Sequence, residues 1–389
     1  MLFKFLIQVI QTFFNRIKPN VWIISGKELS NQHELSIAYA GANARYFQIR
    51  YKNYITRIVF GDCFSEQYIG RVWIWNIRKM IKTVAPECSL AVIEIKFIES
   101  FFKVKNGFKI PRWVEATLDI SESIDRIKKR SGEFREMVRR VKKNNYTYEV
   151  TRDESDFKNF YYKMHVPFVR YRHGNTGYVI NYERYKKLSR HSELLLIKKQ
   201  DIFVAGWFLR HSKRGVYTDL SGFKDGDYKY VKEGAMGALI YFSLLWLKEK
   251  GYSKVSLGGT SPFLKDGILK YKVQVGAQII DSFSVSDKSV ILIEFLKNTQ
   301  GLRDFLVNNP FIFYPEKRNR HAAIFVENHQ LMSGDDLGEI MKPYKNYYGI
   351  EKFHINVFGE DKHLMNLELL PEVAKKIEIH SAQCLFNDN

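Results

Sequence analysis

The stretch GAMGALIYFSLLWLKEKGYSKVSLGGT, residues 234–260, decides how this chain folds. Its first part is a strongly apolar segment that a glycine opens and Gly251 closes, and a glycine is typical of the position just after a helix. Lys254–Leu257 follows with the features of a strand. The pattern therefore predicts a helix over 234–250 that leads through a short turn into a strand.

The segments on both sides extend this pattern. Upstream, residues 193–222 are predicted as consecutive antiparallel strands, preceded by a basic helical region, a strand over 146–151 and a helix over 154–165 that Pro167 ends. Downstream, a short helix within 263–275 and a strand over 278–285 complete the unit. The expected fold class is α/β with a mixed sheet, centred on residues 116–285.

The basic helical region has a cationic outer surface. Nine basic and two acidic residues lie between Arg126 and Lys143, on a helix that is broken near Gly132. Its apolar face consists of Ile127, Phe134, Met137, Val138 and Val141. The outward face, with Arg135, Arg139, Arg140, Lys142 and Lys143, is suited to contact phosphates.

This order of elements resembles the GNAT superfamily of acyltransferases, in particular its FemAB-like branch, over about residues 112–285. In GNAT proteins a glycine-rich turn before the central helix cradles the pyrophosphate of coenzyme A. Lys232, Gly234 and Gly237 match that turn loosely, and Ser221 is assigned with them to donor binding. Free N–H groups at a helix N-terminus do bind anions. The alternative is that the glycines serve only tight helix packing.

A second group of motifs resembles the FemAB-like branch more closely. Strand 254–257 ends in two glycines, and Tyr271-Lys272 with Gly276 fits a (F/Y)-K-x-x-x-G pattern. The resemblance implies that Tyr271 protonates the leaving group, whereas the alternative is an aromatic that only packs on the sheet. Asp219, at the end of a predicted strand, could take a proton from an attacking amine or merely hydrogen-bond the next turn.

Acceptor binding is assigned to the segment after Pro167. Arg170, Arg172 and His173 are predicted to lie in a loop, where two guanidinium groups could bind a carboxylate or phosphate of the acceptor. The alternative is a solvated basic loop. No metal ligand is predicted, since the ten histidines show no HxH or HxxxH spacing.

Charge and cysteine content restrict the partners and the compartment. The net charge of +19 indicates an anionic partner, such as tRNA, a membrane surface or a phosphorylated cofactor, or else a generally basic proteome. The three scattered cysteines are typical of a reducing cytoplasm. Residues 1–18 predict an amphipathic helix that lies on the inner face of a membrane or docks on the protein. The oligomeric state is left open.

The expected organisation has four parts: an amphipathic helix over 1–20, an N-terminal α/β half over 21–115 that is itself a degenerate GNAT-like unit, a catalytic unit over 116–285, and a small parallel α/β appendage over 286–389. Within 21–115, strands are expected over 46–51 and 53–60 and a helix over 67–83. The function expected from the resemblance is N-acyl transfer from an acyl-coenzyme A or aminoacyl-tRNA donor to an amine. The alternative is an inactive GNAT-fold scaffold at a membrane or on nucleic acid.

Overall fold

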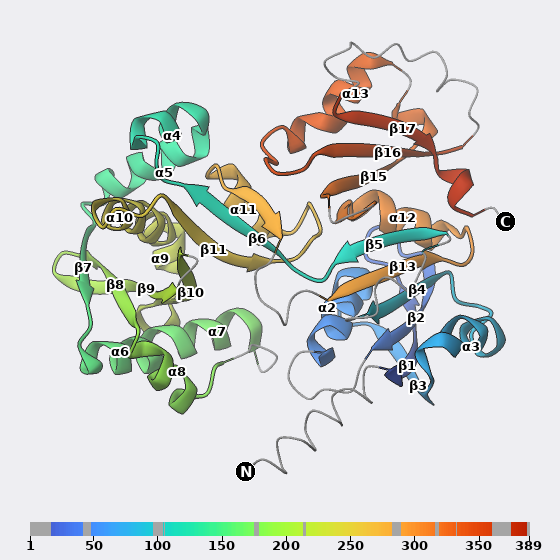
Figure 1. Cartoon of the computed structure of the whole chain (residues 1–389), viewed down its shortest axis with the longest axis horizontal. Helices are drawn as coiled ribbons and strands as arrows, with labels where there is room; N and C mark the ends of the chain where they lie inside the picture. The colour runs from blue at the N-terminus through green and yellow to red at the C-terminus, as the bar shows by residue number, and fades with distance from the viewer. Residues whose placement is uncertain are drawn as a thin grey trace.

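The described part of the chain contains three sheets, and they form two lobes that lie side by side (Figure 1). The computed structural model describes residues 17–41, 48–95, 104, 106–174, 179–212, 215–281, 289–315, 319–331, 333–359 and 375–386. The predicted helix of residues 1–20 lies almost wholly outside the described residues, so that helix and its membrane contact stay predictions. Within the described part, no helix combines the length and hydropathy needed to cross a membrane.

The left lobe of Figure 1 contains a seven-stranded sheet in the order β12-β6-β11-β10-β9-β8-β7. Its strands are β6 (Val114–Asp119), β7 (Thr147–Thr151), β8 (Ser192–Lys199), β9 (Ile202–Ser212), β10 (Gly215–Phe223), β11 (Lys254–Thr260) and β12 (Gln278–Asp281). Its helices are α4 (Ile124–Arg130), α5 (Gly132–Lys143), α6 (Glu154–Phe160), α7 (Val166–His173), α8 (Tyr182–Ser189), α9 (Lys229–Lys232), α10 (Ala235–Glu249) and α11 (Gly267–Gln274). The apolar residues of α5 and α10 pack against the sheet in one continuous core.

The centre of this sheet opens where two parallel strands meet. β10 and β11 pair only at Val216↔Val255 and Tyr217↔Ser256, although the strands are nine and seven residues long. Beyond this point both strands carry an irregularity against their other neighbours, which turns them away from each other. The parallel, splayed pair is the arrangement expected of a GNAT-like core, and the mixed α/β fold class is confirmed.

The right lobe contains a six-stranded sheet in the order β3-β1-β2-β4-β13-β5. Its strands are β1 (Asn20–Lys27), β2 (Glu34–Gly41), β3 (Phe64–Arg71), β4 (Leu90–Ile95), β5 (Gly107–Pro111) and β13 (Val290–Phe295). Helices α2 (Gln48–Phe60), α3 (Ile77–Val84) and α12 (Gln300–Asn308) pack on it. One expected boundary differs: β13 was placed in the appendage of residues 286–389, but it pairs between β4 and β5.

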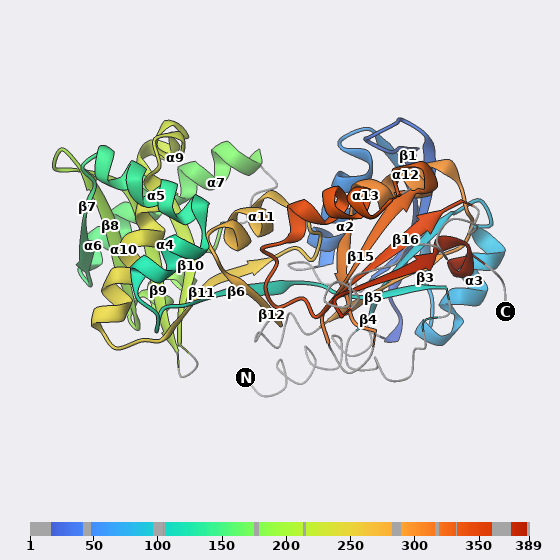
Figure 2. The same ribbon diagram turned by 90° about the horizontal axis from the view of Figure 1, so that it is seen from above.

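The two sheets share one four-stranded pattern and exchange a strand. β2-β4-β13-β5 repeats the pairing of β10-β11-β6-β12: one parallel pair followed by two antiparallel pairs. The chain passes from β5 into β6 of the other sheet and returns from β12 to β13. In Figure 2, β5 and β6 follow one another and lead from one lobe to the other. In each group of four strands the third strand, β13 or β6, therefore comes from chain that has just crossed over from the other sheet.

Three predicted elements of the N-terminal half differ from the structure, two strands wholly and one helix in its first part. The expected strands over 46–51 and 53–60 are replaced by the single helix α2, whose buried Tyr51, Ile55 and Val59 recur at helical spacing. The expected helix over 67–83 is β3 followed by a short 3-10 turn and α3. Both stretches contain β-branched and aromatic residues, whose preference for strands depends on context, so tertiary packing decided between helix and strand.

The third sheet forms the upper part of the right lobe in Figure 1, with the strand order β14-β15-β16-β17. Its strands are β14 (Phe311–Phe313), β15 (His321–Glu327), β16 (Lys352–Phe358) and β17 (Ile377–Ser381), with α13 (Gly334–Met341) between β15 and β16. β15, β16 and β17 are parallel, as expected for this part of the chain, and β14 is antiparallel to β15.

Candidate functional site

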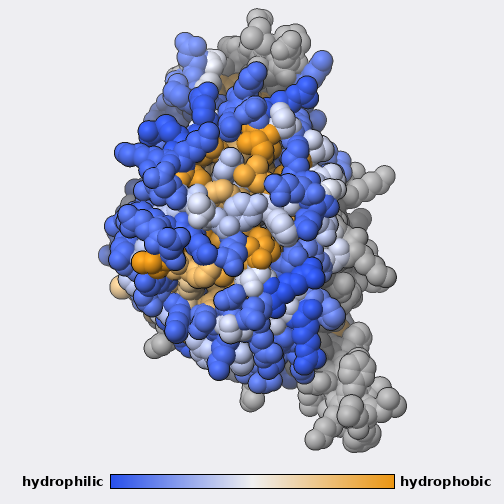
Figure 3. Space-filling model, turned by 90° about the vertical axis from the view of Figure 1, so that its left-hand side faces the viewer, coloured by the Kyte–Doolittle hydropathy of each residue, from blue (hydrophilic) through white to orange (hydrophobic). Residues whose placement is uncertain are grey.

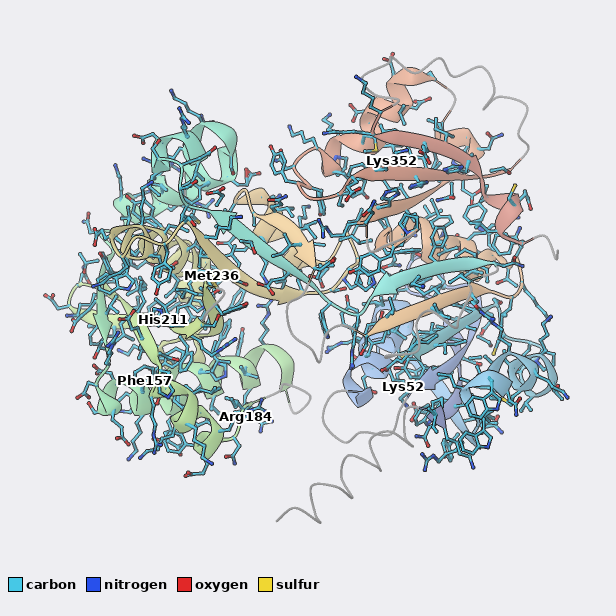
Figure 4. The ribbon with its side chains drawn as sticks, in the orientation of Figure 1. Lys52, Phe157, Arg184, His211, Met236 and Lys352 are labelled. Atoms are coloured by element: carbon cyan, nitrogen blue, oxygen red, sulfur yellow. The ribbon has the colours of Figure 1, made fainter. Side chains whose placement is uncertain are left out.

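A cavity of about 950 Å³ lies at the splay of β10 and β11. α5, the start of α10 and α11 form its walls, and Met236 at the start of α10 is labelled in Figure 4. Apolar lining from Trp207, Ile240 and Leu257 alternates with polar groups. A mostly apolar hollow of this size with a few polar groups is typical of a small-molecule site.

Residues of both splayed strands line the cavity, among them Thr218 on β10 and Gly258 on β11. The hydroxyl of Thr218 donates to the carbonyl of Ser256 at 3.0 Å, which closes the sheet where the parallel pairing ends. Asp219 is the extra residue of the irregularity in β10, between the paired Thr218 and Leu220. Its side chain lies outside the described atoms, so its role stays a prediction. Ser221, two positions further, lines the cavity.

The glycine turn before α10 lies on the cavity wall. Gly234 has φ +99, a left-handed conformation that glycine adopts without strain, and no side chain caps the helix that follows. Gly234 and Gly237 both line the cavity, whereas Lys232 on α9, although described, does not. A Cβ on Gly237 would come within 2.4 Å of Met137 Cγ, so this glycine also allows α10 to approach α5 closely.

Tyr271 faces the cavity from α11. The residue is 36% exposed, and its hydroxyl donates to Met137 Sδ at 3.9 Å, with no bond to backbone among the described residues. Burial of the ring raises the pKa of Tyr271 to about 12, so the hydroxyl keeps its proton at neutral pH. Tyr271 therefore lies on the cavity wall in its protonated form, and its role as proton donor stays a prediction.

Lys272 is a site residue that the sequence motif contained but that was not selected. It is 8% exposed and lines the cavity, and its Nζ donates to the carbonyls of Gly258 at 2.9 Å and Gly259 at 3.1 Å. Burial lowers the pKa of Lys272 to about 8, against the opposing influence of Asp266 and Glu115. An ammonium group has three N–H donors, and among the described residues the third has no partner.

The predicted acceptor loop is helical. Residues 154–173 form α6, a π-helical turn over 161–165 and α7, so Pro167 does not end the helix. The reason is that Pro167 follows a π turn, where the regular ladder of backbone bonds is already interrupted. Arg172 on α7 lines the cavity, while Arg170 is exposed and does not; the side chain of His173 is not described.

His165 also escaped the sequence analysis. It lies in the π turn, 4% exposed, and its Nδ1–H donates to the carbonyl of Ser221 at 2.8 Å. Its Nε2 has no partner in the described part of the chain, and burial lowers its pKa. The backbone of Gly222 approaches it so closely that a Cβ would lie 2.6 Å from His165 N. The neutral imidazole of His165 therefore holds β10, the strand that carries Ser221, through this hydrogen bond.

The basic face of α5 lies beside the cavity. Arg135, Arg139, Arg140, Lys142 and Lys143 are all exposed, and Arg140 lines the cavity together with Glu133 and Glu136. Glu136 pairs with Arg139 at 2.6 Å and Arg140 at 3.0 Å, and these hydrogen bonds lower its pKa to about 2. On the outer face of this lobe, hydrophilic side chains surround small hydrophobic areas (Figure 3).

Comparison with known proteins gives similarity of backbone only. No family model and no curated protein matches the sequence. FemX is similar with a TM-score of 0.37 and 14% identity, over 73% of this chain and 86% of that protein. The C-terminal domain of a protein assigned as a lysylphosphatidylglycerol synthetase from Agrobacterium fabrum gives 0.33 and 12%, over 77% and 91%. A GCN5-related N-acetyltransferase from Sphaerobacter thermophilus gives 0.29 and 11%, over 68% and 74%. At these values the likeness says nothing about substrates.

Proposed function

We propose that this protein is an acyltransferase that moves an acyl or aminoacyl group from an activated donor to an amine. The observation that carries the proposal is the cavity at the splay of β10 and β11, which pair over only two residues each. The splay exposes backbone hydrogen-bonding groups in the middle of a sheet, where they can bind a polar substrate chain. An inactive scaffold has no need of such an opening, and a blocked groove would have favoured that alternative.

The proposed chemistry assigns one task to each group. The amine attacks the acyl carbon, a C–N bond forms, and the C–S or C–O bond to the donor breaks. Tyr271 gives its proton to the leaving group, and a base, with Asp219 as the candidate, takes one proton from the amine. Lys272 places a buried positive charge where negative charge develops on the carbonyl oxygen. Arg172 binds an acidic group of the acceptor.

For the donor, we propose aminoacyl-tRNA ahead of acyl-coenzyme A. The five exposed basic residues of α5 extend from the cavity, through Arg140, along about two helical turns. A polyanionic donor would cover this face, whereas the pyrophosphate of coenzyme A requires only the turn at Gly234. Binding of tRNA should therefore weaken steeply with added salt, and binding of acyl-coenzyme A should weaken little.

The test measures transfer of a labelled acyl group from aminoacyl-tRNA, acetyl-coenzyme A or a longer acyl-coenzyme A to a panel of amines. The discriminating variant is Arg135→Glu with Lys142→Glu, which should weaken tRNA binding by at least about tenfold and leave acyl-coenzyme A binding unchanged. Lys79→Glu with Lys82→Glu makes the same charge change on exposed positions of α3, in the other lobe.

Three results separate the possibilities. Transfer from aminoacyl-tRNA that is lost only in the α5 variant supports the proposed donor. Transfer from acyl-coenzyme A that is indifferent to both variants retains the acyltransferase and replaces the donor. If no donor supports transfer while RNA or anionic vesicles still bind, the inactive scaffold is the correct reading.

A further inference from the structure

Three histidines on three neighbouring strands face one another in the third sheet. His321 begins β15, His354 lies on β16 and His380 on β17. In the parallel register, His354 is opposite Glu378, and His380 is two positions further along the same strand. Because side chains alternate between the two faces of a strand, these residues share one face of the sheet.

The distances within this cluster are close to those of a metal coordination shell. His354 Nδ1 lies 2.9 Å from His380 Nε2 and 3.3 Å from Glu378 Oε2, and His380 Nε2 lies 3.6 Å from the same oxygen. Ligand atoms about 2.0–2.2 Å from a tetrahedral zinc ion are about 3.3–3.6 Å apart, so the two distances to Glu378 Oε2 fit directly. The 2.9 Å between the imidazole nitrogens is that of a hydrogen bond, which a bound ion would replace after a small separation of the two rings. The three atoms therefore form one triangular face of such a shell, and solvent can supply the fourth ligand, since the His380 side chain is 45% exposed.

The surroundings hold these ligands in place. His354 Nε2 and His321 Nδ1 are 2.8 Å apart, so His354 can donate its outer N–H to His321 and present Nδ1 to a metal. Lys352 pairs with the other oxygen of Glu378, which leaves Oε2 facing the imidazoles.

We propose that His354, Glu378 and His380 form a binding site for a divalent transition-metal ion, with Zn²⁺ as the best match. Two imidazoles and a carboxylate are a common ligand set for this ion. The site lies in the right lobe of the molecule, where Lys352 is labelled in Figure 4, away from Met236 and the cavity. Since β17 is an edge strand, the ion would fasten it to β16.

A second carboxylate–histidine group is a weaker candidate and provides a matched control. Glu28, His33 and Asp304 also approach one another. Glu28, however, already accepts hydrogen bonds from the backbone N–H groups of Ser30 and Asn31, and Asp304 accepts one from Gln300. These carboxylates serve to hold a loop and the start of α12, so His33→Ala should not alter metal binding.

The experiment uses the full, tag-free chain, stripped of metal and titrated with ZnCl₂ in a calorimeter and with CoCl₂ in a spectrophotometer. We expect one saturable site and the visible absorption bands of tetrahedral cobalt without a thiolate band. His354→Ala and His380→Ala should each weaken binding by about 100-fold, and His321→Ala by about tenfold. Melting of each variant without metal checks that it folds, and exposed His380 is the substitution least disruptive to folding.

The outcomes are decisive in both directions. One-to-one binding that is lost in His380→Ala and kept in His33→Ala supports the site. Absence of saturable binding to the wild-type chain overturns it, as does unchanged affinity in folded His380→Ala. A cobalt–thiolate band would place the ion on a cysteine such as exposed Cys384 and would also overturn the proposal.

Discussion

At the scale of single residues, two neighbours on α11 show opposite consequences of burial. Tyr271 has its pKa raised to about 12, so burial protects its proton, while Lys272 has its pKa lowered to about 8, so burial weakens its charge. Both line the same cavity. Burial disfavours the charged form in each case. Tyr271 therefore stays neutral at neutral pH, whereas Lys272 loses its positive charge as the pH rises above about 8.

Tyr271→Phe should lower kcat by about 100-fold and leave the KM for the acceptor nearly unchanged, because it removes only a proton given in the transition state. Arg172→Ala is the matched variant, since it should mainly raise the KM for an acidic acceptor. Steady-state kinetics measure both. Full kcat in Tyr271→Phe would leave the ring with a packing role only.

Stability should respond to pH through Lys272. Its folded pKa of about 8 lies below the ordinary 10.5, so between these values the unfolded chain binds more protons and stability rises with pH. Relative to Lys272→Met, the wild type should gain roughly 3 kcal/mol between pH 7 and pH 10.5, at about 1.4 kcal/mol per pKa unit. Urea denaturation of both proteins across this range measures the difference, and a constant difference would contradict the burial of a titrating lysine.

At the scale of elements, the glycine turn serves both packing and the cavity. Gly234 supplies a left-handed residue before α10, and Gly237 lets that helix approach Met137 on α5. The two readings of these glycines, an anion cradle and tight helix packing, are therefore not exclusive. They can be separated experimentally, because the contact partner of Gly237 is a single flexible side chain.

Gly237→Ala should destabilise the protein by about 1–3 kcal/mol through overpacking against Met137. Met137→Ala removes the obstacle, so the double variant should cost at least about 1 kcal/mol less than the sum of the single variants. Urea denaturation gives the three values. Additive effects would show that the two side chains do not meet.

At the scale of the whole molecule, the strand exchange decides which parts can fold alone. Residues 113–282 contain β6 and β12 and so complete the seven-stranded sheet, whereas β4 and β5 of the other sheet are not neighbours without β13. The six-stranded sheet can therefore be completed only after the whole seven-stranded sheet has been synthesised, because β13 follows it in the chain.

We therefore expect a fragment of residues 113–282 to melt cooperatively and a fragment of residues 17–112 to remain unfolded. Adding a peptide of residues 289–309 should rescue the second fragment in part, because it supplies β13 and α12. Circular dichroism during heating measures each transition. Cooperative melting of residues 17–112 alone would show that the six-stranded sheet does not require β13.

The sequence by itself determined the mixed α/β class and the helix that Gly251 closes. These follow from local signals, namely glycine at a helix end, apolar periodicity and strand order, which depend little on distant residues. Tyr271, which the resemblance selected, and Arg172 both line the cavity, Arg172 from a helix rather than the expected loop.

Only the tertiary structure decided the rest. By composition, residues 48–60 are compatible with a strand. They form helix α2 because Tyr51, Ile55 and Val59 are buried against the six-stranded sheet. Lys272 owes its lowered pKa to burial against the carbonyls of Gly258 and Gly259. The cluster of His354, Glu378 and His380 spans two strands, so no spacing along the chain reveals it. Contacts between segments far apart in sequence create these features, and no local pattern encodes such contacts.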